Sequence, residues 1–136
     1  MAYAPATDVG TLKLLTTTPT SWLLSGVTSV GSWTTTTAFR VWSPLGTKAL
    51  YLQGAIVFSG NGVIDYVDAY FRKTGSGHSA NQTENPIFDF AYLNLGAGIN
   101  AYAFAPLIVL CDSNRDIDYQ TLTGGSLYAT ILGYFS

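Results

Sequence analysis

The stretch from Ala49 to Lys73 constrains the fold of this chain more than any other part of the sequence. Within it, two runs rich in β-branched and aromatic residues flank Gly60-Asn61-Gly62. A Gly/Asn turn between two such runs is a strong short-range signal for a β-hairpin. We therefore predict two paired antiparallel strands that are joined at residues 60–62.

The remaining sequence repeats this alternation of strand-forming runs and turn residues. No segment shows a helical period, and turn signals recur at the spacing that is typical of an antiparallel sandwich or barrel. We predict one all-β domain with eight or nine strands in the 136 residues. Besides the hairpin, the predicted strands cover residues 10–16, interrupted at Pro19 and resumed at 21–24, and residues 27–32, 34–42, 86–95, 101–111, 118–122 and 127–135.

The run from Ala101 to Cys111 is apolar on both of its faces. Strand geometry places alternate residues on opposite sides. One side carries Tyr102, Phe104, Ile108 and Leu110, and the other carries Ala103, Ala105, Leu107 and Val109. We expect both sides to be buried, by a second sheet and by a loop or a neighbouring subunit.

A second strand face is half polar and aromatic, as expected of a subunit contact. It belongs to the second arm of the predicted hairpin and includes Asp68. Together with the strand at 101–111 it is the region where we expect protomers to meet. The interface candidates are Tyr66, Tyr70, Arg72, Tyr102, Phe104, Leu107 and Val109.

The composition favours association and disfavours several classes of partner. Charged residues make up 10% of the chain and hydrophobic residues 48%, whereas about 25% of an ordinary globular domain is charged. Part of the surface is therefore expected to be covered by other subunits. The six Lys and Arg residues are scattered and the net charge is -2, which argues against nucleic-acid binding. No apolar run is long enough for a membrane helix.

The sequence offers no convincing catalytic constellation and no cofactor motif. His78 is the single histidine and lies in the polar stretch 74–85, which we expect to be an exposed loop. None of the common nucleophile, zinc or P-loop patterns occurs. Cys111 is the single cysteine and is expected to act as a small buried hydrophobe. We therefore expect a protein that is not an enzyme.

The turn from Asp112 to Asp118 is the one stretch that resembles a metal-binding loop. Oxygen-bearing side chains recur there as in calcium loops, but Ile117 stands where an EF-hand requires glycine, and Arg115 interrupts the series. We therefore expect a plain polar turn with side-chain capping and keep calcium as the alternative. Its candidate ligands are Asp112, Asn114, Asp116 and Asp118.

The high aromatic content, 14% of the residues, permits a second kind of site. Sugars stack on aromatic faces, and a nearby polar loop supplies hydrogen bonds. Most aromatic side chains in an all-β chain of this size belong to the core. Those that are candidates for a glycan platform are Trp33, Trp42, Tyr51, Tyr66 and Tyr70.

Two segments resemble small jelly-roll modules of bacteriophage structural proteins. The first is TKALYLQGAIV followed by DYVDAYFRKTGS, in which an Ala-rich strand precedes a strand that ends in Arg-Lys-x-Gly-Ser. The second is VLCDSNRDIDYQTL followed by SLYATILGYF, an Asp/Arg turn, a Tyr-bearing strand and a terminal strand finishing near Gly-Tyr. The resemblance covers residues 33–136 and carries no catalytic residues.

The resemblance implies an antiparallel eight-stranded jelly-roll sandwich of the tumour-necrosis-factor and C1q shape, assembled as a homotrimer. We expect an N-terminal arm at residues 1–26 and a sandwich domain at 27–136. The implied role is a virion protein, assembled in the host cytoplasm, that decorates or cements the capsid through the major capsid protein or another virion protein. The absence of a stalk ahead of the sandwich favours such a clip-on subunit. A receptor- or glycan-binding module at a tail or fibre tip is the alternative.

Overall fold

The structure is a computed structural model that describes residues 10–59, 65–77, 87–92, 100–121 and 125–136. Nine β-strands and one short 3-10 helix, η1, make up its regular structure in these ranges. Their bounds are β1 Leu12–Leu14, β2 Leu24–Val27, β3 Thr34–Thr36, η1 Arg40–Trp42, β4 Ala49–Ser59, β5 Asp65–Lys73, β6 Ile87–Tyr92, β7 Asn100–Leu110, β8 Ile117–Thr121 and β9 Gly125–Phe135. The predicted all-β class is confirmed.

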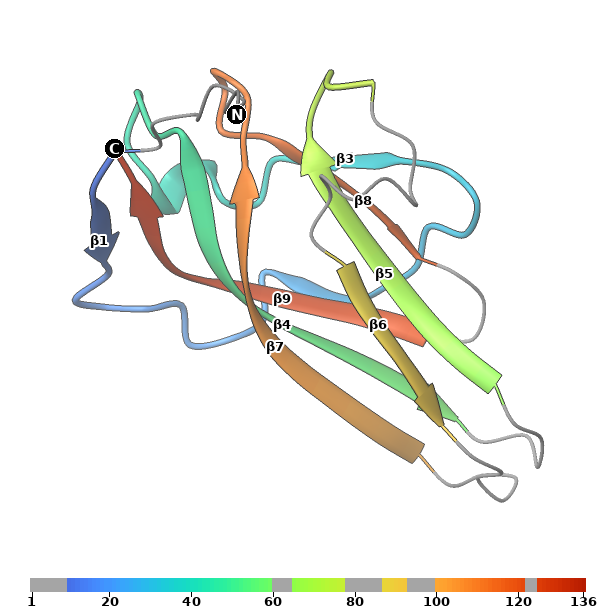
Figure 1. The fold of residues 1–136 in the computed structure, drawn as a ribbon. Coiled ribbons are helices and arrows are strands. Elements are labelled where there is room, and N and C mark those ends of the chain that lie inside the picture. Colours follow the sequence, from blue (N-terminus) through green and yellow to red (C-terminus); the bar gives the residue numbers. More distant parts are fainter. Residues whose placement is uncertain (1–9, 60–64, 78–86, 93–99, 122–124) are drawn as a thin grey trace, which may run out of the picture.

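The strands form two antiparallel sheets that pack as a β-sandwich (Figure 1). The first sheet has the order β1-β9-β4-β7, with β2 also pairing with β9. The second sheet has the order β3-β8-β5-β6. The long strands β4, β7 and β9 lie side by side, so the first sheet offers one broad outer surface (Figure 1).

The predicted hairpin between Ala49 and Lys73 is wrong, although both of its strands exist. β4 pairs with β7 on one side and β9 on the other, so both of its edges are occupied. β5 pairs instead with β6 and β8 in the second sheet. The chain therefore passes from one sheet to the other between β4 and β5, and Gly60-Asn61-Gly62 lies outside the described residues.

The core lies between the sheets and follows the period of two that the sequence shows. Along β9, buried residues alternate with half-buried ones, which turns Leu127, Ala129 and Ile131 inward. Burying a Leu, Ile or Phe side chain contributes about 1.5–3 kcal/mol, so these alternating residues provide much of the stability. The largest fully buried apolar side chains are Phe39, Leu50, Leu52, Ile56, Phe71, Val109, Ile117, Leu127 and Ile131.

The strand predicted over residues 34–42 is only partly present. β3 ends at Thr36, and the chain then turns through η1, where the Trp42 amide donates to the Phe39 carbonyl at 3.1 Å. Phe39 is fully buried in the core. A straight edge strand would not carry this ring between the sheets, so core packing overrides the local β propensity.

The segment expected to be an N-terminal arm, residues 1–26, is integrated into the first sheet over part of its length. β1 pairs with β9 from Leu12 to Leu14, and β2 pairs with the same strand. Leu24 is buried in the core. The sheet therefore begins before residue 26, and residues 1–9 lie outside the described part of the chain. Among the described residues, no helix has the length and apolarity to cross a membrane.

Candidate interaction surface

An apolar stripe runs along the outer face of β7. Alternate side chains of this strand point away from the core because successive residues of a strand face opposite ways. Over eight residue steps the stripe is about 27 Å long. It consists of Tyr102, Phe104, Ile108 and Leu110, which are 60%, 63%, 52% and 41% exposed. We call these four residues the β7 stripe.

The other face of β7 belongs to the core, as the predicted alternation requires. Leu107 and Val109 are buried and pack in the apolar cluster between the sheets. Of the interface candidates on this strand, Tyr102 and Phe104 therefore lie on open surface, whereas Leu107 and Val109 are buried within the chain.

The interface candidates on β5 lie in a different environment. Tyr70 is buried, and the Arg72 side chain is only 16% exposed because it forms an ion pair with Asp118. Its guanidinium also lies 4.3 Å from the ring centroid of Trp33, a cation–π arrangement. The side chain of Tyr66 is outside the described residues. The described part of this face is thus closed by its own contacts.

An aromatic hollow lies beside the β7 stripe on the same sheet. Its floor is Ala55 on β4, which is opposite Phe104 on one neighbouring strand and opposite Tyr128 on the other. A small residue between two aromatic ones leaves a trough of about 380 Å³. Its lining consists of Trp22, Ala55, Val57, Tyr102, Phe104 and Tyr128.

The walls of this hollow are pre-formed by an aromatic contact. The rings of Trp22 and Tyr128 meet edge to face, with centroids 5.8 Å apart at 62°. Three of the predicted platform residues lie outside this hollow: Trp42 packs against the core, Trp33 faces Arg72, and Tyr70 is buried. Finding Trp22 and Tyr128 from the sequence would have required the pairing of β2, β4 and β9 as well as the period of each strand.

The turn at Asp112–Asp118 is held together by protein donors. One oxygen of Asp112 accepts hydrogen bonds from the backbone amides of Asn114 and Asp116 at 2.9 and 2.8 Å. Asp116 receives two hydrogen bonds from the Arg40 guanidinium, at 2.7 and 2.5 Å. These contacts match the capped polar turn. Within the described ranges, no three His, Cys, Asp or Glu side chains gather as a metal site would require.

Asp118, on β8, has three hydrogen-bond donors that the other carboxylates of the turn do not share. It accepts from Arg72 at 2.9 Å and from the hydroxyls of Thr35 and Thr74 at 2.8 Å each. Burial tends to raise the pKa of this carboxyl, but the hydrogen bonds from Thr35, Thr74 and Arg72 outweigh it and leave the pKa below its ordinary value. Asp118 therefore joins β3, β5 and β8 as a buried anion.

Arg115 connects the same turn to the segment around η1. Its backbone adopts a left-handed conformation with φ of 68°. The guanidinium donates to the carbonyl oxygens of Arg40 and Ser43 at 3.0 and 2.7 Å. With the Arg40–Asp116 ion pair, this contact fixes the η1 segment against the turn that follows β7.

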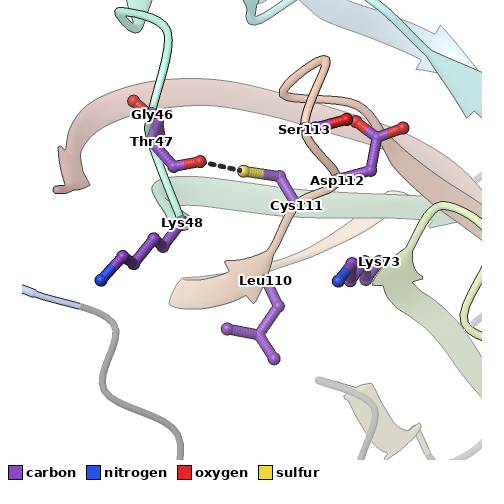
Figure 2. Close-up of a pocket in the computed structure, with 8 residues that line it drawn as sticks. All are labelled: Gly46, Thr47, Lys48, Lys73, Leu110, Cys111, Asp112 and Ser113. Carbon is purple, nitrogen blue, oxygen red and sulfur yellow. Dashed lines mark hydrogen bonds between the residues drawn. The ribbon is translucent and has the colours of Figure 1, made fainter.

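A second hollow opens at the end of the sandwich where β4 begins and β5 and β7 end (Figure 2). It has a volume of about 370 Å³. The Cys111 thiol forms part of its wall and donates to the Thr47 carbonyl at 3.4 Å. Burial, and secondarily the charge of Asp112, raises the pKa of this thiol to about 11. The Cys111 thiol is therefore protonated at neutral pH and lines the hollow.

His78 lies outside the described residues. Comparisons with protein-family models and with curated proteins find no match for the chain.

Proposed function

We propose that the chain is a non-enzymatic phage structural protein that decorates or cements the capsid surface as a homotrimer. The β7 stripe is the observation that carries this proposal. It places four large apolar side chains on one exposed strand of a protein in which only 10% of the residues are charged. A contiguous exposed apolar surface of this kind marks a protein–protein contact.

We also propose that the sandwich is a jelly roll, which is a fold of viral capsid and lectin domains. Two observations support this. β2 to β9 supply eight strands, and from β3 onward the chain changes sheet at every connection except that from β5 to β6. The orders β2-β9-β4-β7 and β3-β8-β5-β6 support a double-sheet roll built from two Greek keys.

The oligomeric state tests the trimer directly. Native mass spectrometry and light scattering should give about 43.5 kDa, three times the 14.5 kDa of one chain. The double variant Phe104→Glu with Ile108→Lys should be monomeric because it places charges within the stripe. Val41→Lys is the matched control, since Val41 is 87% exposed on η1 and is not part of the stripe. A monomeric parent protein would overturn the trimer.

Location on the particle tests the decoration role. Electron cryo-microscopy of the phage that encodes the chain should show the protein on the outer capsid in positions that follow capsid symmetry. A chain lacking residues 1–9 should still fold and trimerise but lose attachment. This truncation is cleaner than removal of residues 1–26, which would also delete β1 and most of β2. Density confined to the tail would contradict the capsid role.

The aromatic hollow favours a second candidate function, a glycan-binding module at a tail or fibre tip. Trp22 and Tyr128 offer ring faces and edges beside the small floor residue Ala55, and none of the lining residues is charged. A neutral sugar ring stacks on such a surface. A glycan array with the parent protein and with Trp22→Ala tests this, because binding that depends on Trp22 supports the module. A cement protein should neither bind cells nor block infection.

A further inference from the structure

We propose that the hollow between Lys48 and Lys73 binds a carboxylate of an acidic segment from a partner polypeptide. This inference rests on the proposed function, because it names the chemistry of the virion surface that the subunit would contact. It concerns the end of the sandwich rather than the β7 stripe alone, so the two can be tested separately.

Two lysines from different sheets line the hollow. Lys48 directly precedes β4 in the first sheet, and Lys73 ends β5 in the second. Both line the hollow, and Figure 2 shows them on opposite sides of Leu110. The wall behind them is fixed, because the Cys111 amide donates to the Lys48 carbonyl at 3.2 Å and the Cys111 thiol contacts Thr47.

The charges around this hollow are unbalanced. Among the described residues, the ion pairs involve Arg40 and Arg72, and neither Lys48 nor Lys73 has a carboxylate partner. One carboxylate, Asp112, lies at the rim, and its Oδ1 already accepts two backbone hydrogen bonds. The lining of the hollow therefore holds two ammonium groups and one carboxylate, and this excess of positive charge favours an anion.

The lining indicates a carboxylate rather than a phosphate. Lysine ammoniums act as point charges, and the lining offers neither a free guanidinium fork nor a helix N-terminus of the kind that suits phosphate. Leu110, which is partly exposed, stands between the lysines. It offers an apolar surface to the methylene groups of a glutamate whose carboxylate reaches the ammoniums.

The position of Leu110 favours a polypeptide ligand. Leu110 is both the last residue of the β7 stripe and part of the hollow. A partner segment that packs one apolar side chain on Leu110, at the end of the stripe, can therefore place an acidic side chain between Lys48 and Lys73. Apolar contact and charge complementarity then act on one continuous surface.

The experiment is an NMR titration of the isotope-labelled full chain with an acetylated, amidated tetraglutamate peptide. Amide shifts should change at Lys48, Lys73 and Ser113, with an apparent Kd on the order of 1 mM at low salt. The Lys48→Gln, Lys73→Gln double variant should bind at least about tenfold more weakly. Lys13→Gln, on β1, is the matched control and should bind as the parent does.

Three results would overturn the carboxylate site. They are no saturable shifts with the peptide, equal binding by the double variant, or tighter binding of inorganic phosphate at the same residues. A tetraglutamine peptide should not bind, because recognition depends on the negative charge of the glutamate side chains. Oligomeric state is measured on every sample: a trimeric double variant with unchanged peptide binding rejects this site alone, whereas a monomeric parent protein rejects the proposed assembly.

Discussion

At the scale of single residues, Cys111 is the most sharply defined side chain for experiment. Its pKa of about 11 means that the thiol is protonated at neutral pH, and the thiolate is the reactive form. We expect a thiol reagent such as DTNB to leave the native protein unmodified at pH about 8, whereas the protein unfolded in guanidinium should react completely. Rapid modification of the native chain would show that the wall at Thr47 is open.

Asp118 sets a pH dependence whose sign follows from its surroundings. Its folded pKa lies below its unfolded pKa, which is about 3.9. The unfolded chain therefore takes up the proton first as the solution is acidified, and the stability from this group is lost as pH falls through and below about 3.9. Urea unfolding of the parent should show this loss, and Asp118→Asn should flatten the curve in that range.

The neighbouring Arg72 supplies the control for that prediction. Arg72→Met should destabilise the protein at neutral pH by about 3 kcal/mol, because it leaves a buried carboxylate without its cation. The hydroxyls of Thr35 and Thr74 remain as donors. If Arg72→Met and Asp118→Asn both unfold at the parent's urea concentration, the ion pair makes no net contribution to stability.

At the scale of elements, Gly133 decides whether β1 can stay in the sheet. A methyl group on this residue would lie 2.5 Å from the Lys13 carbonyl oxygen, which belongs to the strand backbone. Gly133→Ala should therefore loosen β1 and cost about 1–3 kcal/mol. Amide exchange should accelerate at Thr11 and Leu15, which donate to Ser136 and Leu132. Ser126→Ala, on the same strand, should leave both amides protected.

The elements also show what the sequence could and could not predict. The alternation in residues 49–73 located β4 and β5 closely, because a period of two reports the strand itself. This period does not show which strands β4 and β5 pair with. A Gly/Asn turn suits a hairpin, but the short connection between β4 and β5 can also lead into the opposite sheet. The same limit applies around Phe39, where a β-favouring sequence turns because one ring is needed in the core.

At the scale of the molecule, the ion pairs around the acidic turn could not be predicted from the sequence, because their partners lie far apart along the chain. Arg40 and Asp116 are 76 positions apart, and Arg72 and Asp118 are 46 apart. No local spacing connects such partners, so the acidic turn could be read either as a calcium loop or as a capped turn. The apolar alternation of β7, in contrast, is local, and the predicted grouping of its residues into two faces is confirmed. The predicted burial of both faces is not seen in the single chain, because the face that carries the β7 stripe is exposed.

Assembly through the β7 stripe should make the thermal stability of the protein depend on its concentration. If three chains bury the β7 stripe against one another, folding is coupled to association and dilution favours the unfolded chains. The melting temperature should then rise with protein concentration, and Phe104→Glu should remove that dependence while Val41→Lys preserves it. Added salt should leave the apolar contact nearly unchanged, whereas it should weaken peptide binding at Lys48 and Lys73 through screening. A melting temperature independent of concentration would mean that the stripe is free for another partner.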